Sequence, residues 1–483
     1  MTGEARTFME RLRRANLRKL SRWTFDRAAF MAGRLAWHAA CLRMQAQEAF
    51  ALRGQLPPGS LSASCWREAH LDDQFYLKGF RRHGPIFKLF WRSGDLKICI
   101  LGYRLARRLL QENHGRLHPV TIDLTPLVPN EYLRAMDPKI HPHYRSLFVS
   151  ALRSEVTGAC EPQIRSLIKR ELTKLMTADA SMLATRLHDA LDRTAIDTLL
   201  MVIMGVPPDA ECAVALRSAF KRLGPDGYVA PIGAEQRIAF SAIRAVVLSI
   251  LESAASNNAL PSTDSVLGRL AVTRGERIDD TVIGNAIYMV ERGRHDLRDL
   301  LRWIIKHLSD HPEFVTELRA ELSTPKAHSP LAEACVLETL RLEQAELLVR
   351  KALVPFRFLG YQIPKGSWVC TMLRETHRDP KVFPDPETYR PHRFVERHYS
   401  TNEYAPFGLD EHQCIGRSLT LRVGAMLVEE LVGGFSWTVT ADGPRQFGQL
   451  HWQSSPSFAI ALRPLAGAAP FADGRARTVS RPG

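Results

Sequence analysis

The sequence predicts a mainly α fold: one large helical domain with small β-sheets at its edge. Apolar residues recur at helical spacing through most of residues 141–256, and again over residues 279–310 and 330–343. Strand-like alternation is confined to shorter stretches, at residues 84–102 and 352–373. The 483 residues are 45% apolar and 24% charged, a composition that supports one large core.

Turn and proline signals separate these elements and set the expected domain limits. Residues 1–58 are expected to form a basic, amphipathic helical extension, residues 59–466 the main domain, and residues 467–483 a disordered tail. Within the main domain we expect, in order, a helix from about Tyr103, a proline-rich loop at 118–133, a proline-rich meander at 377–394 and hairpins at 435–464.

Net charge and cysteine content limit which binding partners and which cellular compartment are expected. The formal net charge is +14, and residues 1–60 hold eleven Lys and Arg against four Asp and Glu. A basic balance suits nucleic acid, a membrane surface or an acidic protein, but the chain has no nucleic-acid-reading motif, so we interpret this segment as a solvated helix. Arg34 and His38 interrupt the apolar stretch 28–42, which argues against a membrane span. Eight cysteines without a CxxC pair favour a reducing, cytoplasmic location.

The stretch "PFGLDEHQCIGRS", residues 406–418, places one thiol in a glycine-bearing loop ahead of a helical pattern. Free backbone N–H groups near a helix N-terminus favour the thiolate form of Cys414, which is then either a nucleophile or a metal ligand. His412 is the nearest base for a nucleophile, but a residue two positions away in a tight loop points awkwardly. A single thiolate can instead hold haem iron from one side. Taken alone, a lone cysteine is more often an inert buried thiol.

Other motifs accompany this loop. In "ETLR", Glu338 and Arg341 share one helical face. Arg393 of "RPHRF" can complete an ion network with them. In "HPHYR", His141 and Arg145 are four residues apart, an arrangement suited to gripping an anionic carboxylate.

Together these segments resemble the cytochrome P450 family over about residues 60–465. The loop is similar to the family pattern F-G-x-G-x-[HR]-x-C-x-G, and it departs from that pattern at Asp410, where the family usually has glycine. "DPKIHPHYR", "IPKGSWV", "HRDPKVFPDP" and "RPHRF" resemble further family segments in the right order, whereas the usual Pro-Pro after ExxR is missing. The matching loop residues are Phe407, Gly408, His412, Cys414 and Gly416.

The resemblance implies a cofactor, haem b (iron protoporphyrin IX), and a role for each motif. Cys414 is expected to be the axial iron ligand, in a catalytic domain of residues 59–466. The cofactor-binding residues implied are His141, Arg145, Arg350 and His412 at the haem propionates, with Phe407 and Gly416 in the loop. The residues implied to lock the core below the haem are Glu338, Arg341 and Arg393.

The distal helix departs from the resemblance. The family usually carries [AG]-G-x-[DE]-T there, in which the acid and the alcohol relay protons during O2 activation. When "LRWIIKHLSDHPE" fixes the register, Gly293 falls on the glycine, His295 on the acid and Asp296 on the threonine. Arg292 replaces the small residue and can pair with Asp296 one turn away. A register slip of one turn, which would leave these charges merely solvated, is the competing interpretation.

Three functions remain open. The altered relay favours an oxidoreductase of secondary metabolism, whose small, carboxylate-bearing substrate already holds an N–O or O–O bond; nitrene transfer, rearrangement and peroxide use are the reaction types. Fatty-acid peroxygenases, allene oxide synthases and benzastatin-type P450s are the analogies. The first alternative is an O2-dependent monooxygenase with a ferredoxin and reductase as partners, and Asp296 or His295 as relay. The second is a haem protein that only binds a ligand or senses a gas.

Two further expectations concern the pocket. Arg292 and Arg294 should lie near it and favour an anionic substrate. The stretches "AELLVRKA" and "QLHWQSSPS" should line it.

Overall fold

The computed structural model describes residues 35–62, 64–90, 95–119, 124–177, 179–224, 232–256, 264–274, 278–324, 328–343, 347–447 and 451–465. They form two compact units, one within Met1–Val120 and Leu347–Thr376, the other within Thr121–Glu346 and His377–Gly483. Residues 1–34 of the predicted extension and all of the predicted tail lie outside the described residues.

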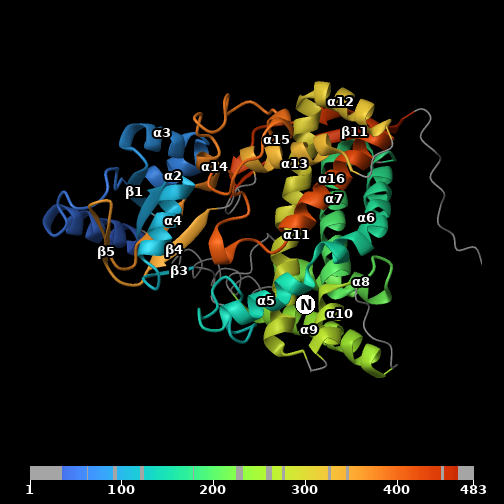
Figure 1. Ribbon diagram of the computed structural model, residues 1–483, viewed down its shortest axis with the longest axis horizontal. Coiled ribbons are helices and arrows are strands. Elements are labelled where there is room, and N and C mark those ends of the chain that lie inside the picture. Colours follow the sequence, from blue (N-terminus) through green and yellow to red (C-terminus); the bar gives the residue numbers. More distant parts are fainter. Residues whose placement is uncertain are drawn as a thin grey trace, which may run out of the picture. The chain divides into compact units, whose positions relative to one another are not determined.

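The first unit is built on one mixed sheet. Its strands are β1 (Ile86–Phe90), β2 (Leu96–Ile100), β3 (Leu117–Pro119), β4 (Leu348–Ala352), β5 (Phe356–Phe358), β6 (Tyr361–Ile363) and β7 (Trp368–Thr371). Its helices include α2 (Ser64–Leu71), α3 (Phe75–His83), α4 (Tyr103–Glu112) and α14 (Leu373–Thr376) (Figure 1). Five strands pair in the order β1-β2-β7-β4-β3, with only the β2–β7 pair parallel among these described strands. Every residue of β1 and β2 is buried, as in strands covered on both faces.

A tight turn joins the two strands of the small β5–β6 hairpin. Leu359 and Gly360 have φ angles of 51° and 81°. Two consecutive positive φ angles are the mark of a type I′ turn, whose twist matches that of the flanking antiparallel strands.

The second unit is mainly helical. Its helices are α5 (His141–Ala151), α6 (Ser154–Leu175), α7 (Leu183–Leu199), α8 (Glu211–Leu223), α9 (Ala234–Ser256), α10 (Val266–Arg274), α11 (Asp280–Asp310), α12 (Pro312–Leu322), α13 (Pro330–Leu342), α15 (His392–Glu396) and α16 (Arg417–Gly434). Shorter turns are the 3₁₀ segments η1 (Ala180–Met182) and η3 (Asp410–His412) and the π-helical η2 (Leu200–Met204). Two antiparallel pairs join β8 (Phe435–Ala441) to β11 (Ala459–Pro464) and β9 (Gln446–Phe447) to β10 (Trp452–Gln453).

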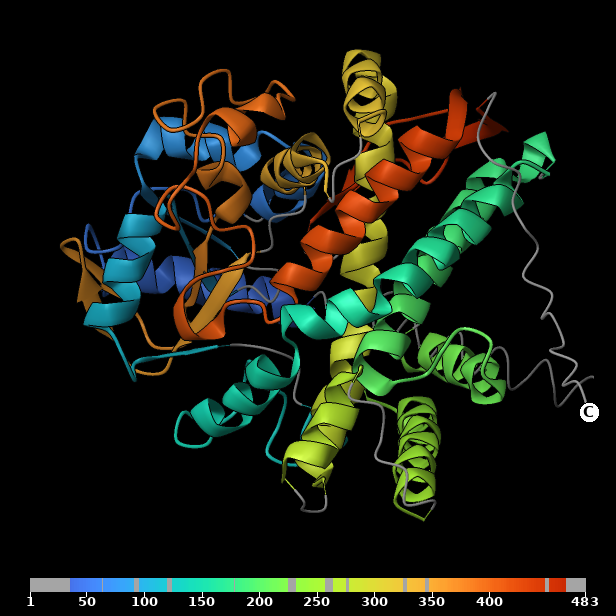
Figure 2. The ribbon, with the colours of Figure 1, turned by 45° about the vertical axis from the view of Figure 1, so that its right-hand side comes forward.

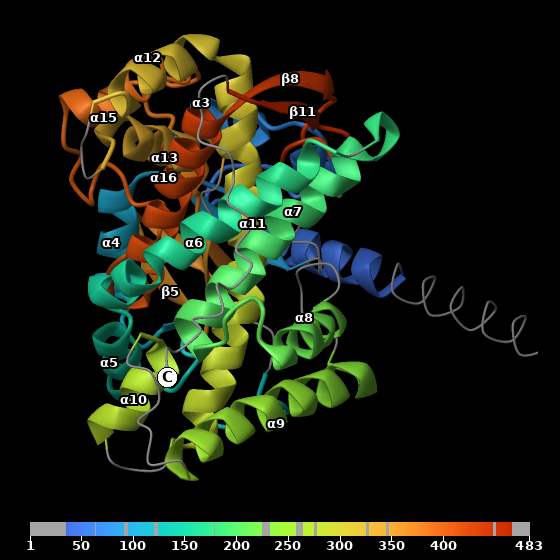
Figure 3. The same cartoon turned by 90° about the vertical axis from the view of Figure 1, so that its right-hand side faces the viewer.

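The 31-residue α11 is the axis of this unit. It begins where the Asp279 side chain accepts a hydrogen bond from Val282 N at 2.8 Å, and it ends before Pro312, which cannot continue a helix. α7 packs along α11, and α6 packs against both α7 and α16 (Figures 2 and 3). The predicted helices at 279–310 and 330–343 therefore match α11 and α13 to within one residue at each end.

A glycine sets how closely α16 approaches its neighbours. A Cβ atom added at Gly424 would lie 2.9 Å from the side chain of Val336 on α13 and 3.3 Å from Ile304 on α11. Only glycine leaves room for this contact. The middle of α16 is thereby packed closely against the two helices that carry the motifs identified in the sequence.

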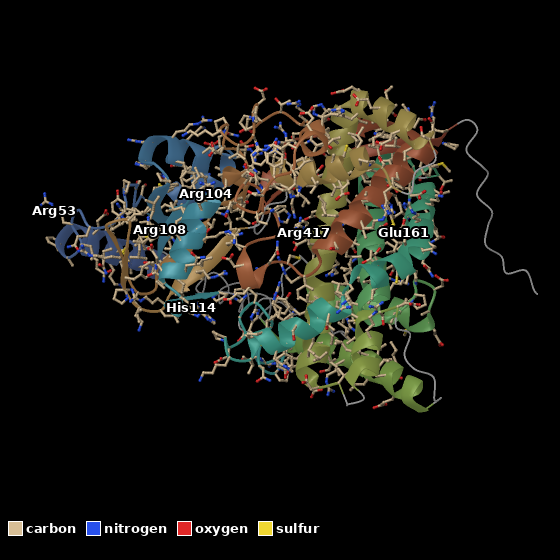
Figure 4. The ribbon with its side chains drawn as sticks, viewed as in Figure 1. Arg53, Arg104, Arg108, His114, Glu161 and Arg417 are labelled. Atoms are coloured by element: carbon tan, nitrogen blue, oxygen red, sulfur yellow. The ribbon has the colours of Figure 1, made fainter. Side chains whose placement is uncertain are left out.

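Partly buried ion pairs join α6 to α16. Glu161, which Figure 4 labels on α6, accepts hydrogen bonds from Arg165 Nε and Arg422 Nε, each at 3.0 Å. Arg165 Nη1 in turn donates to Glu430 at 2.7 Å. The contacts add lateral support to the helix that follows the cysteine loop.

The predicted fold class, mainly α with small sheets, is confirmed. Within the part of the chain that the structure describes, none of the helices combines the length and the apolar character needed to cross a bilayer.

Candidate functional site

The cysteine loop leaves its thiol accessible. Cys414 precedes α16 by three residues, and its backbone N–H donates to Phe407 O at 2.8 Å, which closes the loop. Gly408 has a φ angle of 88°, a conformation that side chains other than glycine rarely adopt. All eight cysteines lie among the described residues, and Cys414 alone is exposed. An accessible thiol is what a group binding from outside the core requires.

Buried cysteines elsewhere are poor candidates for a metal ligand. Burial raises the pKa of Cys335 to about 12 and the pKa of Cys370 to about 11. These thiols therefore stay protonated at neutral pH, whereas a ligand must be the thiolate.

Asp410, the departure from the family pattern, occupies a left-handed conformation with a φ angle of 56°. Glycine adopts this region without strain, which explains why glycine is usual at this position. Aspartate is among the few other residues that tolerate it. The loop geometry is thus kept despite the substitution.

Three of the four basic residues predicted for the haem propionates lie around this loop. The rings of His141 and His412 have centroids 4.6 Å apart, and Arg145 Nη2 donates to Gln413 O at 2.8 Å. Burial lowers the pKa of His141, and the charge of Arg145 lowers it further. Burial also lowers the pKa of Arg145, but the charge of Cys414 opposes this shift, so the two groups are close enough to interact. A cation beside the sulfur is typical of sites that hold a thiolate.

Arg350, the fourth predicted propionate partner, lies on β4 in the other unit. It is buried, and its Nη1 donates to Val349 O at 3.0 Å. Its contact with the cofactor stays a prediction.

The structure brings Glu338, Arg341 and Arg393 together in the core. Arg341 Nε donates to Glu338 Oε2 at 2.7 Å, and Arg393 Nε donates to Glu338 Oε1 at 3.0 Å. The side chains are at most 2% exposed. Arg341 Nη1 also donates to the carbonyls of His377 at 3.0 Å and Pro386 at 2.7 Å, so the cluster ties α13 to the proline-rich meander.

The unusual charges of the distal helix fall on different sides of α11. Arg292 Nη2 lies 3.7 Å from Asp296 Oδ1, and these side chains are 19% and 44% exposed. His295 is buried instead, with Nε2 3.4 Å from Glu291 and Nδ1 3.2 Å from Arg298. Asp296 is therefore more accessible to an incoming molecule than His295.

Arg294 does not offer its charge to a substrate, and that prediction is wrong. It is 3% exposed, and its Nη2 donates to Phe220 O at 3.1 Å and to Gly224 O at 2.7 Å. These carbonyls belong to the C-terminal end of α8, where a cation is favoured by the helix dipole. Glu291 binds the same guanidinium at 3.1 Å, which leaves Arg294 with a structural role.

Two ionisable residues that the sequence interpretation did not single out adjoin the Arg292–Asp296 pair. Asp299 Oδ2 lies 3.3 Å from His451 Nε2 and accepts a hydrogen bond from Gln453 Nε2 at 2.8 Å. His451 belongs to the stretch "QLHWQSSPS", of which residues 449 and 450 lie outside the described residues. So do residues 345 and 346 of the other predicted lining stretch, "AELLVRKA". The available signal was the three-residue spacing of Asp296 and Asp299; nothing in the sequence pairs either with His451.

Comparison with known proteins finds the same class of protein that the cysteine loop and the fold indicate. The family model for cytochrome P450 matches residues 300–456. An abscisic acid 8'-hydroxylase of Solanum lycopersicum is 30% identical over 181 residues, 34% of this chain and 38% of the relative. Abscisic acid 8'-hydroxylase 4 of Arabidopsis thaliana is 24% identical over 428 residues, 80% of this chain and 88% of the relative. A cyanobacterial P450 structure with bound retinoic acid matches with a TM-score of 0.68 at 21% identity, covering 85% of this chain and 99% of that one.

An exposed cysteine in a loop ahead of a helix, on this mainly α fold, is the arrangement of a haem-thiolate protein. The chain resembles the cytochrome P450 family in its fold, in its cysteine loop and in the sequence of residues 300–456. That family implies haem with a cysteine thiolate as the axial ligand, and the chemistry of an oxidoreductase. The relatives named above are hydroxylases.

Proposed function

We propose that this protein cleaves an N–O or O–O bond already present in a small anionic substrate, at a haem held by Cys414. Haem with an axial thiolate supplies the redox chemistry for breaking such a bond. The observation that carries the proposal is the ion pair of Arg292 and Asp296, in which Asp296 stands at the position of the usual alcohol and Arg292 at that of the usual small residue.

The residues around the loop suit the cofactor. Cys414 is the exposed thiol, and His141, Arg145 and His412 lie together around its loop, where basic side chains of this kind could bind the carboxylates of haem. Arg145 is free to bind one carboxylate through further N–H groups, since the guanidinium has five donors and one of them is used at Gln413 O.

Asp296 cannot replace an alcohol as a hydrogen-bond donor. A hydroxyl both donates and accepts hydrogen bonds, whereas the ionised carboxylate of an ion pair only accepts them. Standard proton delivery to O2 should therefore be impaired. A substrate that brings its own cleavable bond avoids this requirement.

Arg292 supports an anionic substrate. Its side chain is 19% exposed and lies 3.7 Å from Asp296, a spacing that leaves room for a second carboxylate partner. The relatives act, by their names, on abscisic acid. Carboxylate binding by this arginine would orient the reacting bond relative to Asp296.

The test uses two probes under nitrogen and without reductant: cumene hydroperoxide for the O–O bond and an O-acyl hydroxamate for the N–O bond. We expect the haem-loaded protein to consume at least one of them. Asp296→Ala and Arg292→Ala should each lower that rate while the Soret spectrum is kept. Strict dependence on O2 and on a ferredoxin–reductase pair, with an atom of labelled O2 in the product, would overturn the proposal.

The second candidate is an ordinary O2-dependent monooxygenase, which the hydroxylase names of the relatives favour. In that case the same assay gives product only when O2, a ferredoxin and its reductase are all present. Absence of turnover under both regimes, with reversible ligand-induced spectral change, would point to a haem protein that only binds or senses a ligand.

The assignment of Cys414 has its own test. The ferrous CO complex of the wild type should absorb at the position typical of thiolate ligation. Cys414→His should lose that band, because imidazole is a neutral ligand. A variant that kept the band would rule out Cys414 as the axial ligand.

A further inference from the structure

A row of charges follows one face of α11. Arg292, Asp296 and Asp299 occupy positions i, i+4 and i+7, which lie on the same side of a helix. His451 reaches this row from the C-terminal segment, with Nε2 3.3 Å from Asp299 Oδ2. A titratable imidazole therefore lies within one helical turn of Asp296.

The C-terminal segment that carries His451 is fastened to α11. Trp303 Nε1 donates to Trp452 O at 3.0 Å, and Arg302 donates to Ser454 Oγ at 3.0 Å and to Ser455 O at 2.8 Å. These bonds lie directly beside His451 in the sequence. The position of the imidazole is consequently set by the helix.

Asp299 is placed to hold the imidazole ring and to stabilise its charge. Its Oδ1 accepts from Arg298 Nε at 2.8 Å, and its Oδ2 accepts from Gln453 Nε2 at 2.8 Å. Burial alone would raise the pKa of Asp299, but the hydrogen bonds and charges of His451 and Arg298 hold it below its usual range. The carboxylate is therefore ionised at neutral pH.

His451 responds in the opposite direction. Burial alone would lower its pKa, but the hydrogen bond and the charge of Asp299 outweigh burial and raise it. Asp296 adds to this rise, and Arg292 opposes it. On the other side of the pair, α7 contributes Asp192, whose Oδ1 lies 3.6 Å from Arg298 Nη1, and His188, whose pKa is lowered by burial and by Arg298.

We propose that His451 carries the proton for the reaction at Arg292 and Asp296, and that Asp299 is the positioning residue that orients its ring. This inference rests on the proposed function. When the N–O or O–O bond breaks, the bonding electron pair leaves with one oxygen as an anion. The atom left behind is short of that pair, and haem bound at Cys414 would supply the two electrons. Protonated His451 gives its proton to that oxygen, an O–H bond forms, and the neutral imidazole takes a new proton from solvent. The proton transfer changes no oxidation state.

The experiment follows the rate of cumene hydroperoxide consumption by the haem-loaded protein as a function of pH. Wild type should lose rate as pH rises through the raised pKa of His451, because the acid is then deprotonated. His451→Gln should lower the rate by about 10²-fold at low pH, the usual size of a general-acid contribution, and remove this limb. Asp299→Asn should move the limb to lower pH. His392→Gln, at a histidine on α15 whose side chain is 37% exposed, is the matched control and should change neither.

A second readout does not depend on turnover. In the ferrous CO complex, NMR titration of labelled histidine should show one resonance that titrates above the usual histidine range, is absent in His451→Gln, and shifts to lower pH in Asp299→Asn and Asp296→Asn. A His451 resonance that titrates at or below the ordinary value, or that both Asn variants leave unchanged, would overturn the inference.

The two readouts separate failure of the inference from failure of the proposed function. If wild type consumes neither probe but the resonance behaves as expected, the proposed substrate class is wrong, whereas the pairing of His451 with Asp299 is supported. If wild type consumes a probe and His451→Gln keeps the wild-type pH profile, the bond-cleaving function stands and His451 is not its proton carrier. If His451→Gln fails to hold haem, the Asp299→Asn titration decides the inference.

Discussion

The buried cluster below the cysteine loop and the charge row on α11 use the same residue types in contrasting ways. In the cluster, Glu338 and Arg341 are fully buried, 2.7 Å apart, and backbone carbonyls bind the remaining arginine N–H groups. On α11, Arg292 and Asp296 are 3.7 Å apart and partly exposed. Close, fully bonded ions hold a fold in place, whereas the pair on α11 is accessible to an incoming molecule. The contrast is the basis for expecting a structural role in one region and, under the proposed function, a chemical role in the other.

The largest effect should come from breaking the buried cluster. Arg341→Ala leaves the Glu338 carboxylate in the core without its main partner, which typically costs about 3–5 kcal/mol. The free energy of unfolding, measured by urea titration, should fall by that amount, and haem content should fall with it. Arg390→Ala is the control, because Arg390 forms an exposed pair with Glu396 that should contribute no more than about 1 kcal/mol. Equal losses of unfolding free energy in the two variants would show that the buried cluster is no more important for stability than an exposed ion pair.

The charge row should show the reverse pattern. Asp296→Ala is expected to lower turnover of the peroxide or N–O probe by up to about 10²-fold, because Asp296 pairs with Arg292 and its charge raises the pKa of the proton donor His451. Its free energy of unfolding should change by less than about 1 kcal/mol, because a partly exposed ion pair contributes little. Unfolding and turnover are measured on the same preparation. A large loss of stability with unchanged turnover would make this pair structural too.

Asp410 tests whether the loop depends on backbone conformation. Asp410→Val should destabilise the protein by about 1–2 kcal/mol, because a β-branched side chain is strained at a φ angle of 56°. Asp410→Gly restores the residue usual in the family, and its free energy of unfolding should exceed that of Asp410→Val by at least about 1–2 kcal/mol. Thermal unfolding with bound haem gives both values. The idea fails if valine and glycine behave alike.

The pH dependence of stability should be the smallest signal. His451 has a raised pKa in the folded state, so its contribution is fully present below the pKa of an unfolded histidine, about 6.5, and is lost as pH rises through the folded pKa. The difference in unfolding free energy between wild type and His451→Gln should therefore be larger at about pH 6 than at about pH 9. Asp299, whose pKa is lowered, contributes above the unfolded aspartate pKa, about 3.9, and loses this contribution as pH falls. A difference that does not vary between the two pH values would show that the pKa of His451 is the same in the folded and unfolded states.

These regions also differ in how much of them the sequence could reveal. Glu338, Arg341 and the Cys414 loop stand in local motifs, so spacing along the chain was enough to place them. His451 and Asp299 are 152 residues apart, and only the packing of the C-terminal segment on α11 brings them together. Arg294 was placed near the pocket because it follows Arg292 closely, but its partners are backbone carbonyls of α8, which leave no trace in the residue types.

The close approach at Gly424 bears on how such a protein can change over generations. Because α16 touches α13 and α11 there with no space for a methyl group, that position admits almost no variation while the haem loop is kept. The accessible charges of α11 carry no such restriction, since exchanging them leaves the helix contact intact. New reactions can therefore arise by substitution on the distal face of an inherited scaffold, one residue at a time, with every intermediate still able to fold.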